Sequence, residues 1–168
     1  MFKKILVANR GEIAVRIIRA CKELNIKTVA IHSNVDTEAM HVKLADESIC
    51  VGSALPNESY LNIPSIISAI DITGADAVHP GYGFLSENDK FAKILSSHKV
   101  KFIGPTSKSI LELGNKSNAL RLASDFKLPI LGNKNSKNID NTSDAQKISK
   151  EIGMPVVIKA AYGLSLIH

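Results

Sequence analysis

The amino-acid sequence predicts an α/β fold, a doubly wound parallel sheet, followed by the beginning of a second domain. Short apolar runs of strand length recur about every 20–25 residues through the first part of the chain, with helical apolar patterns between them. The first run, residues 5–8, is continuously apolar, which is typical of a strand buried on both faces of a parallel sheet. This alternation favours helices on both faces and right-handed crossovers.

Sequence signals also place the helices between the strands. A helix is expected over residues 13–24, whose apolar side chains line one side, and a weaker helical pattern covers residues 37–44. Asn62 and Pro64 indicate the start of the third helix, and Ser86 is expected to cap the fourth. The expected strands are residues 5–8, 28–31, 48–51, 77–79 and 100–103.

The alternation of strand and helix changes after residue 105. The next segment is predicted to form two helices that break at Gly114, followed by a polar loop, a helix capped at Ser143 and an apolar strand over residues 155–160. One helix and one strand are too little to bury a core, so we expect the first 105 residues to fold and the last ones to pack loosely. The predicted domains are residues 1–105, a helical connector over 106–131, and an incomplete second domain over 132–168.

Composition and charge narrow the class of protein. With 45% apolar and 22% charged residues the chain is globular. Its net charge of +5 comes from scattered lysines and arginines and its aromatic content is 5%, so no nucleic-acid partner is expected. No apolar run approaches the roughly 20 residues of a membrane span. Cys21 and Cys50 lie far apart, which favours reduced core thiols in a cytoplasmic protein, and no histidine pair has the spacing of metal ligands.

The loop after the first strand is one candidate binding element, because a doubly wound sheet binds ligands at the C-terminal ends of its strands. Gly11, after Asn9 and Arg10, would expose backbone N–H groups at a helix start, which favours an anion. A simple turn glycine is the alternative. The dinucleotide-binding pattern G-x-G-x-x-G is absent, since only one of its glycines is present.

The second candidate loop, HPGYGFLSEN over residues 79–88, places two glycines around a tyrosine. Gly81 and Gly83 allow backbone conformations closed to other residues and let another group approach closely. Tyr82 would then be presented outward, with a flat face and a hydroxyl group. The alternative is a glycine turn in which Tyr82 and Phe84 pack on the edge of the sheet.

Two lysines are candidates for binding an anion. Lys116 stands where one predicted helix passes to the next, and Lys159 lies at the end of the last apolar strand. A lysine on an otherwise buried strand is costly unless its ammonium meets an anion or reaches water. Phosphate oxygens are an obvious partner, and ordinary solvent-exposed lysines are the alternative.

The first helix carries a charged stripe. Arg16, Arg19 and Glu23 lie three and four residues apart, so they share one side of the helix. Spacing leaves two readings open: a solvated face, or a contact between subunits.

Several segments resemble biotin carboxylases. They are the opening FKKILVANRGEIAVRIIRACKELNIKTVAIHS, the loop HPGYGFLSEN, and the segments ADESICVG, SYLNIP, KFIGP and LGNKSNA. The resemblance runs from residue 2 to about residue 161, and HPGYGFLSEN is highly specific to biotin-dependent carboxylases. It is greatest to the subunit of acetyl-CoA carboxylase, the enzyme of fatty-acid synthesis. The resemblance implies a Rossmann-like pre-ATP-grasp domain followed by the start of an ATP-grasp domain.

The resemblance also implies an activity. In that family ATP activates bicarbonate as carboxyphosphate with Mg²⁺ or Mn²⁺, and CO₂ passes to biotin on a carrier protein. The homodimer and the biotin carboxyl carrier protein are the implied partners. The positions that gain a role are Lys116 and Lys159 for ATP, Tyr82 and Gly83 for the biotin pocket, and Arg16, Arg19 and Glu23 for the homodimer contact.

The end of the chain departs from the family pattern. A glycine-rich loop over the ATP phosphates should follow Lys159, but the sequence supplies only Gly163, and one glycine gives too few backbone N–H donors. The catalytic and metal-binding residues belong further downstream in the family. We therefore expect a truncated, inactive chain with no catalytic or metal-binding residue and very weak ATP binding. A noncatalytic interaction fragment that pairs with carboxylase subunits is one alternative, and an NAD(P)-binding Rossmann module, which the missing glycines disfavour, is another.

Overall fold

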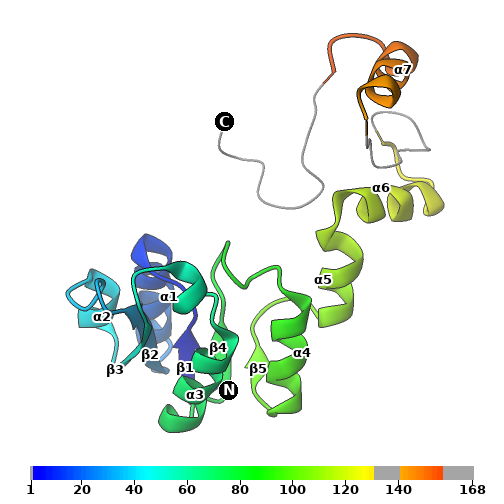
Figure 1. The fold of residues 1–168 in the computed structure, drawn as a ribbon. Coiled ribbons are helices and arrows are strands. Elements are labelled where there is room, and N and C mark those ends of the chain that lie inside the picture. Colours follow the sequence, from blue (N-terminus) through cyan, green and yellow to red (C-terminus); the bar gives the residue numbers. More distant parts are fainter. Residues whose placement is uncertain (1, 131–140, 157–168) are drawn as a thin grey trace. The chain divides into compact units, whose positions relative to one another are not determined.

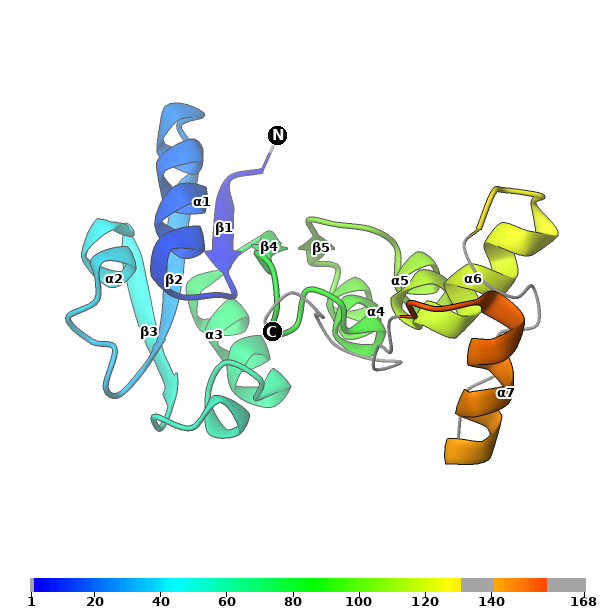
Figure 2. The same cartoon turned by 90° about the horizontal axis from the view of Figure 1, so that it is seen from above.

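A five-stranded parallel sheet forms the centre of the N-terminal part of the chain (Figure 1). Its strand order is β3-β2-β1-β4-β5, which Figure 2 shows from one edge of the sheet to the other. The chain thus begins in the middle and winds outward in both directions, so the predicted doubly wound fold is confirmed. The structure, a computed structural model, describes residues 2–130 and 141–156. It divides into two compact units, Met1–Lys108 and Ser109–His168.

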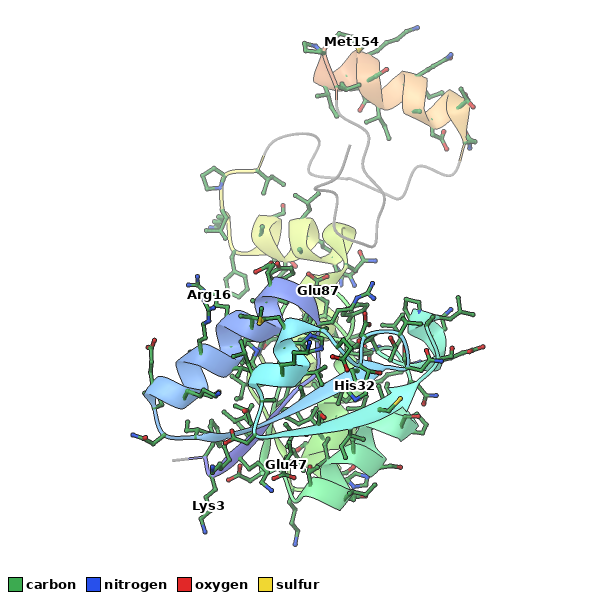
Figure 3. The ribbon with its side chains drawn as sticks, turned by 90° about the vertical axis from the view of Figure 1, so that its left-hand side faces the viewer. Lys3, Arg16, His32, Glu47, Glu87 and Met154 are labelled. Atoms are coloured by element: carbon green, nitrogen blue, oxygen red, sulfur yellow. The ribbon has the colours of Figure 1, made fainter. Side chains whose placement is uncertain are left out.

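Strands and helices alternate through the first unit. Helices α1 and α2 cover one face of the sheet and α3 and α4 the other (Figure 3), as right-handed crossovers require for this strand order. The elements are β1 (Lys4–Val7), α1 (Gly11–Glu23), β2 (Lys27–Ser33), α2 (Met40–Leu44), β3 (Glu47–Gly52), the short 3₁₀ helix η1 (Pro56–Glu58), α3 (Ile63–Thr73), β4 (Ala77–His79), α4 (Asp89–Ser97) and β5 (Lys101–Phe102).

The core of this unit follows from the apolar runs of the sequence. Strands β1 and β2 are almost entirely buried, and helix α1 packs its apolar side against them through Ala14, Ile17, Ile18 and Cys21. Burying one isoleucine side chain contributes on the order of 2 kcal/mol. The opposite side of α1 stays exposed, which leaves its charged residues free of the core.

Four details differ from expectation. Asn88, and not Ser86, caps α4, because its Oδ1 accepts the Phe91 N–H at 2.8 Å while the Ser86 N–H is bound in a turn to Gly83. Asn141 replaces Ser143 as the cap of a later helix. Helix α2 is shorter than predicted, since the residues before it form turns. Cys50 is exposed, not a core thiol, because β3 is an edge strand of the sheet.

The second unit is helical over its described residues. The predicted break at Gly114 is confirmed, since α5 ends there and Asn115 caps the next helix by accepting the Asn118 N–H at 3.1 Å. Helix α7 has no buried residue. The predicted strand over residues 155–160 lies almost wholly outside the described residues. No helix in the described ranges is long and apolar enough to cross a membrane. The three helices are α5 (Ser107–Gly114), α6 (Lys116–Asp125) and α7 (Thr142–Ile152).

Asp46 ties the start of β3 to the start of β2. Its carboxylate accepts hydrogen bonds from the Thr28 N–H at 2.9 Å, the Thr28 hydroxyl at 2.8 Å and the Lys27 ammonium at 3.0 Å. The bonds from Lys27 and Thr28 lower the pKa of Asp46 to about 2. The folded pKa therefore lies below the ordinary value of 3.8. The stabilisation is complete above pH 4 and is lost as the pH falls toward 2.

We predict that Asp46→Asn flattens the acid limb of the stability curve. The urea midpoint of the wild type should fall steeply between about pH 4 and pH 2, because Asp46 becomes protonated there. The midpoint of the variant should fall less over the same interval. The measurement is urea unfolding followed by circular dichroism at several pH values. Asp71→Asn, at an exposed position on α3, should keep the wild-type slope. Equal slopes for wild type and Asp46→Asn would contradict the assignment.

Candidate functional site

Several polar side chains of the first unit lie at the C-terminal ends of the strands. The direction of winding reverses between β1 and β4, which are neighbours in the sheet. Doubly wound sheets bind ligands at such a switch point. Here it is bordered by the loop that begins at Asn9, after β1, and by residues 80–88, after β4.

Asn9 joins these two loops. Its side chain is only 3% exposed, and its Nδ2 donates hydrogen bonds to the carbonyl oxygens of Pro80 and Tyr82, both at 2.8 Å. Gly81 lies so close that a Cβ atom there would be 2.7 Å from the Asn9 Nδ2. The Asn9 side chain therefore bridges the two loops at the switch point, where an NAD(P) module would bind its dinucleotide.

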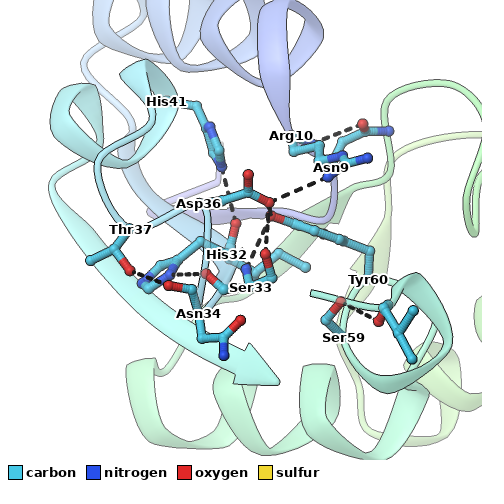
Figure 4. A network of polar contacts seen from close by, with 12 residues as sticks. Asn9, Arg10, His32, Ser33, Asn34, Asp36, Thr37, His41, Ser59 and Tyr60 are labelled. Atoms are coloured by element: carbon cyan, nitrogen blue, oxygen red, sulfur yellow. Dashed lines mark hydrogen bonds and ion pairs between the residues drawn. The ribbon is translucent and has the colours of Figure 1, made fainter. Parts of the chain in front are cut away.

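A polar network extends from this junction to the loop after β2 (Figure 4). The Asp36 carboxylate accepts hydrogen bonds from the Tyr60 hydroxyl at 2.5 Å and the Ser33 hydroxyl at 2.8 Å, and Arg10 Nη1 lies 3.4 Å away. Partial burial alone would raise the pKa of Asp36, but these hydrogen bonds outweigh it and lower the pKa. Burial, and next the bond to Asp36, raise the pKa of Tyr60 to about 12.

An aromatic stack holds the loop after β4 at a second point. Phe84 has a φ of +42°, in the left-handed region that residues other than glycine seldom adopt. Its ring stacks on Tyr60 with centroids 5.2 Å apart and planes at 20°. The guanidinium carbon of Arg10 lies 5.3 Å from the Tyr60 centroid and 5.8 Å from that of Phe84. A cation over aromatic faces contributes about 0.5–1 kcal/mol at such partly exposed positions.

The glycine loop shows part of each of the two alternatives that the sequence left open. Gly81 and Gly83 have φ values of +66° and +67°, and Tyr82 between them is 57% exposed. Phe84 packs inward against Tyr60. The loop therefore exposes the side chain of Tyr82 to solvent and leaves that of Phe84 half-buried. Gly11 also lies in the left-handed region, with φ of +65°, at the first position of α1.

The charged stripe of α1 borders an open hollow of about 800 Å³. Arg16, Arg19 and Glu23 line it together with residues of α2, and Figure 3 shows Arg16 projecting from α1. Met40 on α2 is 62% exposed and lies in the same wall. The stripe is therefore a recessed surface with an exposed apolar side chain beside its charges.

Comparison with known proteins identifies the family. Residues 1–110 match the family described as the N-terminal domain of biotin carboxylase. The chain belongs to the biotin carboxylase family. It is 49% identical over 163 residues to the biotin carboxylase of Haemophilus influenzae, covering 97% of this chain and 36% of that protein. It is 51% identical over 162 residues to the mitochondrial propionyl-CoA carboxylase alpha chain of Caenorhabditis briggsae, covering 96% of this chain and 22% of that protein.

Solved structures agree with this assignment. One is the biotin carboxylase domain dimer of the Hydrogenobacter thermophilus 2-oxoglutarate carboxylase in complex with MgADP, ADP and bicarbonate, with TM-score 0.88 and 45% identity over 97% of this chain and 36% of that one. Another is the biotin carboxylase–beta-gamma-ATP complex from Campylobacter jejuni, with TM-score 0.89 and 44% identity over 98% of this chain and 37% of that one. The chain thus spans little more than a third of the length of the biotin carboxylases it matches.

The sequence-predicted residues do not all fall in one described place. Tyr82 and Gly83 lie in the loop that Asn9 holds, whereas the α1 stripe lines the separate hollow. Lys116 is the first residue of α6, and Lys159 lies outside the described residues. Sequence reasoning missed Asp36 and Tyr60, since nothing in their spacing shows that they meet. Asn9 and Phe84 were in the highlighted loops, but their contacts were not foreseen.

We predict that Gly81→Ala destabilises the chain more than Gly11→Ala. Both glycines have nearly the same φ. Placing alanine in this left-handed conformation therefore costs each variant a similar amount, about 1–2 kcal/mol. Only at residue 81 does the added methyl meet Asn9; at Gly11 nothing lies within 4 Å. Displacing a buried amide adds about 1–3 kcal/mol for its unsatisfied donors. Urea unfolding of the two variants measures the difference in their free energies of unfolding. Equal losses of stability would show that the close contact between residue 81 and Asn9 does not affect stability.

Proposed function

We propose that this biotin carboxylase region serves ATP-dependent carboxylation of carrier-bound biotin with bicarbonate. The observation that carries the proposal is the close fit, in sequence and in fold, to biotin carboxylase domains whose structures contain adenine nucleotides and bicarbonate. The biotin carboxyl carrier protein is then the macromolecular partner. Because relatives include propionyl-CoA and 2-oxoglutarate carboxylases, the assignment to acetyl-CoA carboxylase and fatty-acid synthesis is our proposal from the sequence segments quoted above.

Four residues are proposed for ligand binding. Lys116 and Lys159 would meet ATP phosphates, since an ammonium group is a compact charge suited to phosphate oxygens. Tyr82 and Gly83 would border the biotin pocket, and the exposed side chain of Tyr82 between two glycines is compatible with contact to a flat ring. When bound, Mg²⁺ or Mn²⁺ would neutralise charge on the phosphates. The described residues hold no group of three or more His, Cys, Asp or Glu side chains fit for a metal ion.

We further propose that residues 1–168 do not turn over by themselves. The chain matches only 36% of the length of the Haemophilus biotin carboxylase, and a catalytic site in this family needs groups beyond that region. A second candidate function, a noncatalytic fragment that pairs with carboxylase subunits, is favoured by the recessed stripe of α1 with its exposed Met40. Co-purification of the chain with an intact carboxylase would support this second function.

A chimera tests the enzymatic proposal. We predict that the Haemophilus influenzae biotin carboxylase keeps ATP-dependent carboxylation of biotin when its first third is replaced by residues 2–161 of this chain. Within the chimera, Lys116→Gln should raise the KM for ATP about tenfold or more, the effect of losing roughly 1.4 kcal/mol of phosphate binding. Lys150→Gln, at an exposed position on α7, is the matched control and should leave that KM unchanged. A folded chimera without ATP-dependent carboxylation would refute the proposed function.

We also predict that the α1 stripe pairs two copies of the chain. In a twofold interface the same patch meets itself, so arginines of one copy can meet Glu23 of the other. Arg19→Glu should convert a dimer into monomers in sedimentation velocity at micromolar concentration. Lys22→Glu makes the same charge change on an exposed residue of the same helix outside the hollow, and it should leave the dimer intact. A wild-type chain that is monomeric at all concentrations, or equal effects of both changes, would count against this surface.

A further inference from the structure

The Tyr82–Gly83 peptide group has one side fixed by a buried partner. The Tyr82 carbonyl oxygen accepts a hydrogen bond at 2.8 Å from the side-chain amide of Asn9, a residue that is 3% exposed. The same nitrogen also donates to the Pro80 carbonyl, and the Asn9 Oδ1 accepts the Arg10 N–H at 2.9 Å. All the polar atoms of this side chain are therefore engaged, which fixes its orientation.

The direction of the carbonyl determines the direction of the next N–H. The peptide bond between Tyr82 and Gly83 is trans, and in a trans peptide the C=O and N–H bonds lie in the peptide plane and point in opposite directions. Because the Tyr82 carbonyl faces the buried Asn9 amide, the Gly83 N–H faces away from it. Within the described residues this N–H makes no hydrogen bond, while the Gly83 carbonyl accepts the Ser86 N–H at 2.9 Å. The half-buried Gly83 thus offers a free donor.

Without Asn9 this orientation would not be maintained. Gly81 and Gly83 adopt left-handed and right-handed conformations with nearly equal ease, so the peptide between Tyr82 and Gly83 has little intrinsic preference for one face. Phe84, held against Tyr60 and Arg10, fixes the chain on the far side of Gly83 but makes no bond to the peptide itself. The Asn9 amide is the described group that selects one of the two orientations.

We propose that Asn9 is a positioning residue of the biotin pocket: it holds the Tyr82–Gly83 peptide so that the Gly83 N–H is presented to an oxygen acceptor of the bound substrate. The inference rests on the proposed function only for the identity of that substrate. The orientation itself is a property of the chain and is measured without turnover.

Asn9→Asp is the decisive substitution, and Asn88→Asp is its matched control. Asn9 acts on the loop as a donor, so an isosteric carboxylate would face two carbonyl oxygens and repel them. Asn88 acts as an acceptor toward the Phe91 N–H, a task that aspartate performs equally well at a helix N-cap. Asn9→Ala removes both donors without adding a charge, so it remains informative where a buried carboxylate would prevent folding.

The peptide is observed directly by NMR on the full 168-residue chain. Labelling tyrosine carbonyl carbons with ¹³C and glycine nitrogens with ¹⁵N leaves only the two Tyr-Gly pairs, Tyr82-Gly83 and Tyr162-Gly163, in a carbonyl–amide correlation spectrum. In Tyr82→Phe the labelled carbonyl at residue 82 is absent, so the peak that disappears is that of Tyr82–Gly83. We expect Asn9→Asp and Asn9→Ala to shift this peak and Asn88→Asp to leave it in place. An unmoved peak in both Asn9 variants overturns the proposal.

A pH titration distinguishes positioning from general damage. In Asn9→Asp, protonation of the new carboxyl group restores one donor, so the Tyr82–Gly83 peak should return toward its wild-type place as the pH falls from about 9 to about 4. Burial and the two facing carbonyl oxygens raise the pKa of this carboxyl group above the ordinary aspartate value, so the change should fall above about pH 4. The charged or titratable groups at these loops are Arg10 and Glu87, together with Asp36, which contacts Arg10, and His79, which contacts Gly81. Wild type titrated in parallel accounts for their own effects. A displaced peak in Asn9→Asp that is insensitive to pH overturns the donor role.

The substrate is tested in the active chimera. Asn9→Asp should raise the KM for biotin about tenfold and leave the KM for ATP unchanged, whereas Asn88→Asp should change neither. An equal rise in both constants would overturn the positioning role. An inactive chimera would refute the proposed function, and the NMR result would still decide whether Asn9 orients the peptide.

Discussion

The hydrogen-bonding requirement of one buried amide organises the ligand-binding edge of the sheet. Asn9 lies two residues after the end of β1, the first and central strand, and its amide loses water on folding, so each of its donors needs a partner. The partners are carbonyl groups of the loop after β4. Because both strands are parallel neighbours, their C-terminal ends lie side by side, and one side chain reaches across. The loop after β4 is thereby attached to the most buried part of the fold.

Arg10 and Tyr60 extend this attachment to the third loop of the same edge. Arg10 follows Asn9 in sequence, so the peptide that fixes Asn9 also fixes the base of its guanidinium, which lies over Tyr60 and Phe84. Tyr60 in turn donates to Asp36, after β2. Each contact is modest in energy, since surface ion pairs and cation–π contacts contribute about 1 kcal/mol or less. Together they leave the strained Phe84 backbone with no easy route to relax.

The sheet and most helices could be predicted from the sequence, because a buried strand and an amphipathic helix leave periodic apolar patterns within a few residues. The contacts of the site could not. Asn9 and Tyr82 are separated by 73 positions, and Asp36 and Tyr60 by 24, so only the strand order brings them together. Cys50 illustrates the same limit: its apolar neighbours predicted burial, but the topology puts β3 at an edge. Ser86 and Asn88 both had the chemistry of a cap, and backbone conformation selected Asn88.

The two glycines around Tyr82 explain why this edge needs a rigid anchor. Glycine permits Gly81 to approach the Asn9 amide at a distance that no Cβ would allow, and it permits the turn that leaves Tyr82 exposed. The same freedom raises the entropy that must be lost when the loop is ordered. A loop of this composition cannot hold a donor in one direction by its own preferences. The orientation of this donor therefore depends on a group outside the loop, and the buried, fully hydrogen-bonded side chain of Asn9 after the central strand is such a group. The two glycines thus allow the turn and the close approach, and the hydrogen bonds of Asn9 fix the conformation that the glycines leave free.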